Sequence, residues 1–562
     1  MLQAFIKEGV DTVFGYPGGG IMPFYDRLYE YTDRLRHILV RHEQGAIHAA
    51  QGYARVKGVP GVVIVTSGPG ATNVITGIAD AMADSTPLVV VTGQVGTALL
   101  GTDAFQESDV IGLTTPITKW NCQIRRPEDV APAVARAFYI ARSGRPGPVV
   151  LDFTKDAQTG LAEFDYRPCT FIRSYDPCPE PGQDEIERAA EMINKAERPL
   201  MVFGQGIILS HAENELRSFL EKSDMPAGST MLGLSALPSD FPGCIGMAGM
   251  HGNIAVNVMT QKCDLLVAVG MRFDDRVTGK TSDYARQAKI IHIDIDAAEI
   301  GKIIKPDLGI NGDAKTVLPR IEALLEKRDH SDWKTVSRMC YAVENNKVIN
   351  PEIRPGTGNI NMGEVVDTVA DVTGGDAVIV TDVGQNQLIA ARYSRFTRSR
   401  SMITSGGLGT MGFGIPAAIG AKIGAPDRKV CLFVGDGGLQ MTVQEFGTIL
   451  QEQVGVKIVL MNNNWLGNVR MWQDFFYNKR YSFTRMINPD FAALASAYGI
   501  VYKVVRCRED LKGALTEMFS DDRPWLLDVE VKEEGVVFPM VPPGKGVNDI
   551  MLNEKDWFDY GE

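Results

Sequence analysis

The stretch Lys429-Val-Cys-Leu-Phe-Val-Gly-Asp-Gly-Gly438 is the clearest indication of the fold class of this chain. It opens with a mostly apolar run of strand length, and three glycines and Asp436 follow directly. A second such run, 457–461, is followed by Asn462, Asn463 and Asn464. Apolar strands with a helical pattern between them are typical of a parallel sheet covered on both faces. Ligands bind where such strands end, so these polar residues mark a candidate site.

The same alternation of short β-branched runs and helical patterns continues along the whole chain. The predicted fold class is therefore α/β, with parallel sheets flanked by helices. Besides the run quoted above, the clearest predicted strands are 61–66, 88–92, 148–153, 200–203, 265–269, 290–295, 377–381, 457–461 and 525–531.

A chain of 562 residues is too long for one hydrophobic core. Two stretches with Pro and without periodicity, 167–183 and 345–361, predict linkers. They separate three consecutive domains, and the first and third share a plan of Gly-rich turn, helix and strand that hints at duplication. The predicted bounds are 1–165 for a first domain, 184–335 for a central domain, 360–535 for a third domain and 536–562 for a C-terminal arm.

Composition places the chain among ordinary globular proteins, with 44% apolar and 22% charged residues. A formal charge of −12 without a basic tract argues against a nucleic-acid or anionic-membrane partner. The Cys residues are scattered without a CxxC pair, and the His residues lack zinc-ligand spacing. We see no signal peptide and no membrane-length apolar run, so we expect a soluble, cytoplasmic protein. The first helix looks short, which we interpret as a trimmed or late start.

Asp436 and Asn463 are separated by one predicted helix and one predicted strand. This spacing places them at neighbouring strand ends, where carboxylate and amide oxygens suit Mg²⁺ and glycine N–H groups suit phosphate. Each motif alone is ordinary turn chemistry, but the pair resembles the signature of thiamine-diphosphate enzymes. That family holds Mg²⁺ through the Asp, the second Asn and a main-chain carbonyl two residues later, which implies Asp436, Asn463 and Trp465 here.

Gly407, Gly409 and Gly412 form a GxGxxG pattern before a helical stretch at 416–422, which matches the dinucleotide fingerprint. No clear strand precedes it, because 399–405 is polar and rich in Arg. We therefore interpret the pattern as a loop around the same cofactor, with Met411 as an apolar prop.

The first domain offers Glu43, after an apolar run at 38–40 and before a small-residue helix at 46–56. Alone, such a residue reads as a helix cap or half of an ion pair. The Gly-rich segments 15–20 and 66–73 change this reading, because they bring glycines to strand ends beside it. Thiamine needs an acid that drives its aminopyrimidine ring into the imino tautomer, and a partly buried Glu with a raised pKa suits that task.

Many short segments stand in the order found in the catalytic large subunits of acetohydroxyacid synthase, also called acetolactate synthase, and the chain resembles that family over nearly its whole length. The resemblance implies that pyruvate is decarboxylated on thiamine diphosphate, and that the hydroxyethyl carbanion adds to pyruvate or 2-oxobutanoate. The products would be 2-acetolactate or 2-aceto-2-hydroxybutanoate, in the first common step of branched-chain amino-acid biosynthesis. The segments are FGYPGG, RHEQGA, TSGPGATN, DAFQE, GRPGPV, GMHG, RFDDRVTG, SGGLGTMGFG, GDGG and PMVPPG.

The resemblance also implies site residues. Glu43 would activate the cofactor, Arg276 would clamp the acceptor carboxylate, and Trp472 would favour 2-oxobutanoate. The reacting centre and its entrance would be lined by Gly20, Phe105, Gln106 and Lys155. Thiamine diphosphate would be held by Val383, Gly384, Gln385, Met411, Gly435, Asp436, Gly437, Gly438 and Asn463. FAD, structural because carboligation is redox neutral, would contact Arg145, Gly204, Gln205, Gly206, Met250, His251, Gly252, Arg272, Asp274, Arg276, Asp294 and Asp313.

In that family the acid and the diphosphate site come from different chains, which implies a homodimer or homotetramer with sites across the interface. A small regulatory subunit is a further implied partner. Asn386 departs from the family, which commonly has His there.

The rivals are an FAD-dependent pyruvate oxidase, a flavin-free acetolactate synthase and a glyoxylate carboligase, of which the last should lack the acid at position 43. From another class, a non-catalytic dinucleotide-binding protein conflicts with intact Glu43, Asp436 and Asn463.

Overall fold

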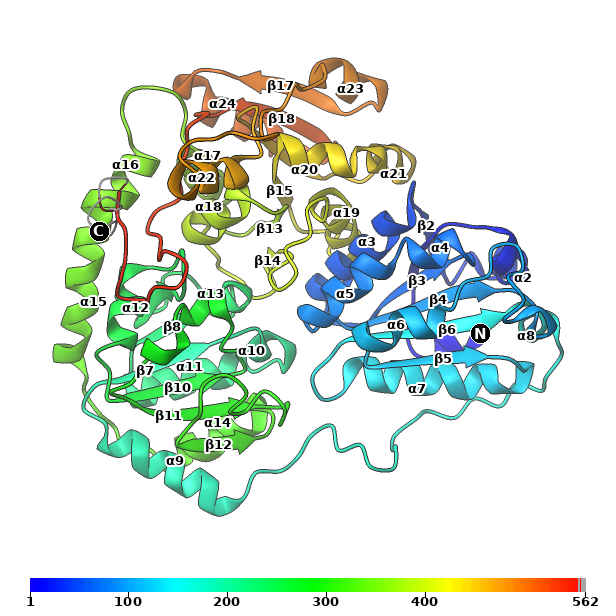
Figure 1. Cartoon of the computed structure of the whole chain (residues 1–562), viewed down its shortest axis with the longest axis horizontal. Helices are drawn as coiled ribbons and strands as arrows, with labels where there is room; N and C mark the ends of the chain where they lie inside the picture. The colour runs from blue at the N-terminus through cyan, green and yellow to red at the C-terminus, as the bar shows by residue number, and fades with distance from the viewer. Residues whose placement is uncertain (554–555, 557–562) are drawn as a thin grey trace.

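The computed structural model describes residues 1–553 and 556 of the chain. It contains three six-stranded sheets, and the strands within each sheet are parallel (Figure 1). Two buried apolar clusters serve each sheet, one for each face. The predicted α/β class with three consecutive sheet-and-helix domains is therefore confirmed.

The N-terminal domain lies at the right of Figure 1, in blue and cyan. Its strand order is β2-β1-β3-β4-β6-β5. The strands are β1 (Thr12–Gly15), β2 (Arg36–Leu39), β3 (Gly61–Val65), β4 (Leu88–Gln94), β5 (Trp120–Ile124) and β6 (Pro148–Thr154). The helices are α1 (Leu2–Lys7), α2 (Met22–Leu28), α3 (Glu43–Lys57), α4 (Pro69–Thr72), α5 (Ile75–Ala83), α6 (Val110–Thr114), α7 (Val130–Arg142) and α8 (Lys155–Thr159).

The middle domain, at the lower left of Figure 1, has the strand order β12-β11-β10-β7-β8-β9. Read from the other edge this is 3-2-1-4-5-6, the order of dinucleotide-binding sheets. The strands are β7 (Pro199–Phe203), β8 (Ala227–Ser229), β9 (Cys244–Met247), β10 (Leu265–Val269), β11 (Lys289–Asp294) and β12 (Leu308–Asn311). The helices are α9 (Gln183–Lys195), α10 (Gly206–Leu209), α11 (Glu213–Ser223), α12 (Ile254–Thr260), α13 (Asp275–Thr278), α14 (Ala314–Ala323) and α15 (Ser331–Glu344).

The C-terminal domain, at the top of Figure 1, has the order β14-β13-β15-β16-β18-β17, which repeats the strand order of the first sheet and supports the predicted duplication. The strands are β13 (Val378–Thr381), β14 (Met402–Ile403), β15 (Val430–Gly435), β16 (Lys457–Asn462), β17 (Val501–Val505) and β18 (Trp525–Glu530). The helices are α16 (Asn350–Ile353), α17 (Met362–Thr373), α18 (Gln385–Tyr393), α19 (Gly414–Gly424), α20 (Asp436–Met441), α21 (Phe446–Glu452), α22 (Gly467–Phe476), α23 (Phe491–Ala497) and α24 (Arg508–Met518).

Two local predictions were wrong. A short strand, β14, does precede the GxGxxG loop, although its flanking residues are polar. The second predicted linker begins as helix, since α15 runs on through a π-helical turn at Asn345–Ile349 into α16.

Helices α3 and α19 join the first domain to the third by crossing at very short range. A Cβ at Gly52 would lie 2.0 Å from the Ala417 carbonyl oxygen, and one at Gly420 would lie 1.8 Å from that of Ala49. Only glycine allows this approach at both positions. The crossing therefore fixes α3, which begins at Glu43, against the C-terminal domain.

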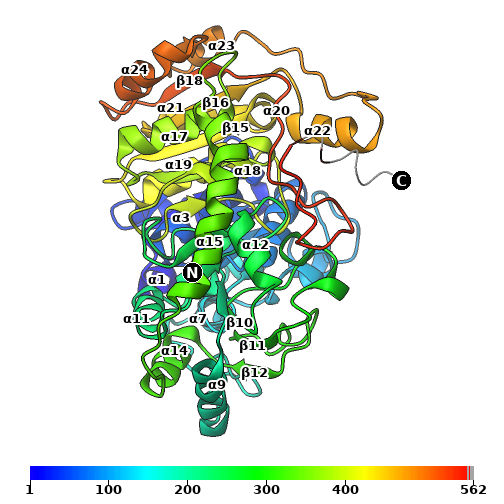
Figure 2. The same ribbon diagram turned by 90° about the vertical axis from the view of Figure 1, so that its left-hand side faces the viewer.

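The C-terminal arm descends from β18 over the middle domain, as the red segment of Figure 1 shows. Its residue Gly546 forms a bridge with Gly279, and the His251 ring lies 3.2 Å from the Pro539 carbonyl oxygen. Residues 554–555 and 557–562 of the predicted arm lie outside the described residues. Figure 2 shows α15 running up one side of the molecule from the middle to the C-terminal domain. Within the described chain, no helix is both long and apolar enough to cross a membrane.

Candidate active site

Asp436 and Asn463 lie at neighbouring strand ends of the C-terminal sheet. Strands β15 and β16 pair in parallel register, with Gly435 opposite Met461. Asp436 begins α20 directly after β15, and Asn463 follows β16. The carboxylate and the amide therefore meet at the carboxyl edge of the sheet, where ligands of such folds bind.

The two carboxylate oxygens of Asp436 differ in their hydrogen bonding. Asn488 Nδ2 donates to Asp436 Oδ2 at 2.8 Å and lies 3.1–3.2 Å from the side-chain oxygens of Asn462 and Asn464. Asp436 Oδ1 is buried and, among the described residues, has no hydrogen-bond partner. Burial raises the pKa of Asp436 to about 6. A buried carboxylate oxygen without a partner calls for an explanation, and a bound cation supplies one.

Further amide groups surround this point. Asn463 Oδ1 accepts from the Trp465 N–H at 3.1 Å, and its Nδ2 lies 3.5 Å from Gln385 Oε1. The side-chain oxygens of Asn386 and Asn468 are buried and lack partners within the described part of the chain. Polar atoms without partners thus gather at this edge, as a site for a metal ion and a phosphate group requires.

The Gly-rich loop before α19 bends around a buried carboxylate, Asp382. This residue accepts from the N–H groups of Gly412 at 3.1 Å and Gly414 at 2.8 Å. Met411, directly before Gly412, points at the turn after β15, because its Cε lies 3.7 Å from the position of a Cβ on Gly437. Met411, the predicted apolar prop, therefore lies beside the turn Gly435–Gly438, where the diphosphate is expected.

Glu43 is the first residue of α3, at the carboxyl edge of the N-terminal sheet. Asn73 Nδ2 donates to Glu43 Oε2 at 2.9 Å. Glu445 of the C-terminal domain accepts from the N–H groups of Arg41 and His42 at 3.1 Å, and its burial raises its pKa. A carboxylate near a helix N-terminus is electrostatically favourable, so Glu445 stabilises the turn that presents Glu43.

The other predicted residues of the reacting centre in this domain follow three strands, β1, β4 and β6, on the same side of the sheet. The Gly20 N–H donates to Thr66 Oγ1 at 3.1 Å, and Lys155 Nζ donates to the Gly19 carbonyl at 3.2 Å. Phe105 is 88% exposed, and Gln106 adopts a left-handed conformation with φ of 60°. Non-glycine residues in sparsely populated backbone conformations cluster at functional sites, so this loop is a candidate contact surface.

In the described part of one chain, no hydrogen bond or ion pair connects Glu43 or Gln106 with Asp436 or Asn463. Neither Glu43 nor Asp436 lines the large cavity of the chain.

That cavity, about 1030 Å³, lies at the carboxyl edge of the middle sheet, where the strand order reverses between β7 and β10. It extends to Val383, Gly384 and Trp472 of the C-terminal domain. A groove at such a switch point is where dinucleotides bind. The predicted flavin contacts that line it are Arg145, Gln205, Gly206, Met250, His251, Arg272, Asp274, Arg276, Asp294 and Asp313.

Gly204 and Gly252 are the predicted flavin contacts that do not line the cavity. A Cβ at Gly204 would lie 2.4 Å from the Gly270 carbonyl oxygen, and one at Gly252 would lie 2.4 Å from that of Met247. These glycines let backbone segments pack against each other. Burial raises the pKa of Asp294, inside the cavity, to about 7.

Sequence reasoning missed Asn488, Asp382 and Glu445. None belongs to a recognisable motif, since each is distant in sequence from the residue that it holds. The only available signal was that Asp382 directly follows the predicted strand 377–381.

Comparison with known proteins agrees with this geometry. Residues 1–113, 186–321 and 382–529 match the N-terminal TPP binding domain, the central domain and the C-terminal TPP binding domain of thiamine pyrophosphate enzymes. The acetolactate synthase large subunit of Lactococcus lactis subsp. lactis is 44% identical over 548 residues, 97% of this chain and 94% of the relative. The acetolactate synthase isozyme 2 large subunit of Escherichia coli is 44% identical over 553 residues, 98% of each chain.

Because both thiamine-binding domains are present and the predicted polar residues lie at the carboxyl edges of their sheets, the chain is a thiamine-diphosphate-dependent enzyme. More narrowly, it belongs to the family of acetolactate synthase large subunits, as its sequence motifs predicted.

Proposed function

We propose that the chain condenses two molecules of pyruvate to 2-acetolactate with release of CO₂, and pyruvate with 2-oxobutanoate to 2-aceto-2-hydroxybutanoate. The observation that carries this proposal is that one chain has both halves of the site. These halves are a buried Asp436, of which one carboxylate oxygen has no hydrogen-bond partner among the described residues, and Glu43 at the start of α3. Thiamine diphosphate, when bound, supplies the electron sink for decarboxylation.

The C-terminal sheet edge would hold the metal and the diphosphate. We assign Mg²⁺ to Asp436 Oδ1, the Asn463 amide oxygen and the Trp465 carbonyl, because hard cations prefer oxygen ligands. The backbone N–H groups of the Gly435–Gly438 turn and the segment Val383–Gln385 would face the phosphates. Glu43 would exchange a proton with a ring nitrogen of the cofactor, while Gly20 and Gln106 border the space for the reacting carbonyl.

The complete site would form between two chains. The lack of a direct hydrogen bond between Glu43 and Asp436 in the described part of one chain, together with the exposed Phe105 next to Gln106, supports a homodimer with each site built across the interface. The name "large subunit" of the relatives supports a smaller partner subunit as well, which would copurify with this chain.

Mixing two inactive variants tests this arrangement. Co-expressed Glu43→Gln and Asp436→Ala chains would carry two different affinity tags, and mixed dimers would be purified through both tags. These mixed dimers should have about half of the wild-type rate of acetolactate formation, because each keeps one intact site of two. Persistent inactivity of the purified mixed dimer would place both residues in a site within one chain and contradict the proposal.

FAD is the ligand that we assign to the cavity of the middle domain. Its strand order, its volume of about 1030 Å³ and its lining by Arg272, Asp274 and Asp294 support a dinucleotide. The condensation is redox neutral, so the flavin would have a structural role. Flavin absorbance in the supernatant of the denatured protein would confirm it, whereas oxygen uptake with peroxide release would support a pyruvate oxidase instead.

Trp472 would select the acceptor. It lines the cavity, and its ring lies 5.0 Å from that of Phe476. An apolar contact with one extra methylene is worth about 1–3 kcal/mol. We therefore expect Trp472→Leu to lower the preference for 2-oxobutanoate over pyruvate about tenfold or more.

The measurement is product partition in a mixture of both acceptors. Phe475→Leu, on the same helix but facing Phe538 of the arm, is the matched control and should leave the partition unchanged. An unchanged partition in Trp472→Leu would mean that another residue selects the acceptor.

Arg276, which lines the same cavity, would bind the acceptor carboxylate.

A further inference from the structure

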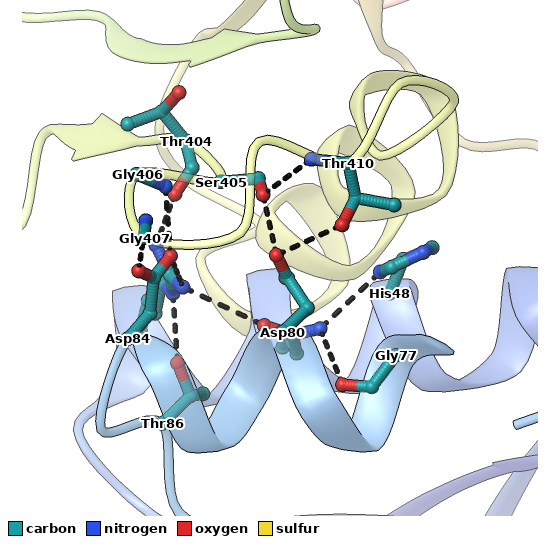
Figure 3. A network of polar contacts seen from close by, with 12 residues as sticks. His48, Gly77, Asp80, Asp84, Thr86, Thr404, Ser405, Gly406, Gly407 and Thr410 are labelled. Carbon is teal, nitrogen blue, oxygen red and sulfur yellow. Dashed lines mark hydrogen bonds and ion pairs between the residues drawn. The ribbon is translucent and has the colours of Figure 1, made fainter. Parts of the chain in front are cut away.

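A buried polar network connects helix α5 of the N-terminal domain with the segment 404–410 of the C-terminal domain. Figure 3 shows this network, with α5 below and the segment, which we call the glycine loop, above. Asp80 and Asp84 point from α5 toward the glycine loop (Figure 3). Both carboxylates are at most 1% exposed. The function described above uses neither of them.

Asp84 holds two consecutive peptide groups of the glycine loop. Its Oδ2 accepts from the Gly406 N–H at 2.9 Å, and its Oδ1 accepts from the Gly407 N–H at 2.6 Å. Arg55 of α3, itself buried, completes the set with a bond of 2.7 Å to Asp84 Oδ2 and another to the Thr404 carbonyl. One carboxylate and one guanidinium thus fix both ends of the turn 404–407.

Asp80 holds the next two polar side chains of the same loop. Its Oδ1 accepts from the hydroxyl groups of Ser405 and Thr410, the latter at 3.1 Å. The Thr410 N–H in turn donates to Ser405 Oγ at 2.8 Å. The other oxygen, Asp80 Oδ2, is buried and lacks a partner in the described part of the chain.

This arrangement is unfavourable for α5 alone. Asp84 is the residue after the last helical turn, where the helix dipole disfavours a negative charge. Burial of two carboxylates against a single Arg is also unfavourable unless each is well hydrogen-bonded. The hydrogen bonds that offset these two unfavourable free energies go to the glycine loop and to Arg55. The network therefore serves the conformation of that loop rather than the stability of α5.

The glycine loop matters because of what its other side faces. Ser405, Gly406, Gly407, Leu408 and Gly409 line the large cavity, and the chain then continues into Met411. A Cβ on Gly407 would lie 2.9 Å from Asp84 Oδ1, so this position must be glycine for the carboxylate to approach. From its own domain the segment is held by Gln387, which donates to Thr404 Oγ1 at 2.7 Å and to the Ser405 carbonyl at 2.9 Å.

We propose that Asp84, with Arg55 and Asp80, is a positioning residue for thiamine diphosphate. Through these residues the N-terminal domain of each chain fixes the glycine loop, which lines the cavity assigned to FAD and leads into Met411 beside the Gly435–Gly438 turn of the same chain. The link from loop to cofactor rests on the proposed placement of thiamine diphosphate beside Met411. The domain that presents the acid to one site thereby also shapes the diphosphate site of its own chain.

The test is Asp84→Asn, which keeps the size of the side chain but removes the charge that Arg55 and two N–H groups require. In hydrogen exchange followed by mass spectrometry, we expect peptides covering 404–412 to exchange about tenfold faster, with strand 430–435 unchanged. The thiamine diphosphate concentration for half-maximal activity should rise about tenfold, while kcat at saturating cofactor stays within about twofold.

Two further variants make the outcome decisive. Thr410→Val removes one hydroxyl from the network without creating a buried charge, and it should give about threefold effects of the same sign even if Asp84→Asn fails to fold. Glu364→Gln removes a buried carboxylate paired with Arg508 at the start of α17, and it should move neither readout. Unchanged exchange in 404–412, or faster exchange with unaltered cofactor half-saturation, would overturn the proposal. A wild-type chain without acetolactate formation would instead count against the proposed function.

Discussion

Glu43→Gln is expected to lower kcat for acetolactate formation by about 10²–10⁴-fold, the range that a positioned acid or base contributes. Glutamine keeps the size of the side chain and still accepts from Asn73, so the start of α3 should remain intact. It cannot, however, exchange a proton with the cofactor ring. We therefore expect an unchanged thermal midpoint and little change in the half-saturating pyruvate concentration. Steady-state kinetics and a thermal unfolding curve measure both.

The matched control for this prediction is Glu185→Gln. Glu185 also stands in the first turn of a helix, α9, where it accepts from the Gly182 N–H at 2.9 Å. If Glu43 were only a helix cap, the two substitutions would have similar, small effects on activity and comparable effects on stability. Retention of full decarboxylation by Glu43→Gln would remove Glu43 from the chemistry.

Asp436→Ala should weaken Mg²⁺ binding by at least about 100-fold, since even the loss of a group behind a metal ligand weakens binding about 10–100-fold. The reason is the buried Asp436 Oδ1, which has no other partner among the residues described. Asn488→Ala should fall between this variant and the wild type, because Asn488 only orients the carboxylate through Oδ2. The measurement is a Mg²⁺ titration of chelator-treated protein, followed by activity and by calorimetry in the presence of thiamine diphosphate.

Asp490→Asn is the control for the metal series. Asp490 caps α23 in the same domain and accepts from the Ala492 and Ala493 N–H groups, so its loss should affect stability and leave the Mg²⁺ requirement unaltered. An Asp436→Ala chain that responds to Mg²⁺ as the wild type does would mean that the ion binds elsewhere.

Most of the central strands were predictable because burial on both faces leaves a continuous apolar run, but the short interior strands β1 and β8 were not among them. Strand β10 (Leu265–Val269) matches its prediction at both ends, and β3, β15, β16 and β18 match within about one residue at each end. Edge strands such as β5 and β17 were missed. Most of their residues are only partly buried, so polar and apolar side chains are mixed and the sequence shows no clear hydrophobic periodicity.

The candidate ligands at strand ends were also predictable. In a parallel sheet the order strand, turn, helix forces the residue after each strand to the same edge, and this places Asp436 beside Asn463 wherever β15 and β16 are neighbours. Asn488, Glu445 and Asp84 could not be found in this way. Each acts on a residue or loop brought close only by packing between separate elements, and no spacing along the chain encodes that proximity.

Local periodicity and the turns at strand ends were enough to predict the α/β class, the class of cofactor and candidate residues for its site. The side chains that hold these residues follow from the packing of distant segments: Asn488 on Asp436, Glu445 at the start of α3, and Asp84 on the glycine loop. A buried carboxylate or amide is stable only when its hydrogen-bond partners surround it. Those partners come from whichever helix or loop the fold brings near, as the glycine-to-backbone crossing of α3 and α19 illustrates.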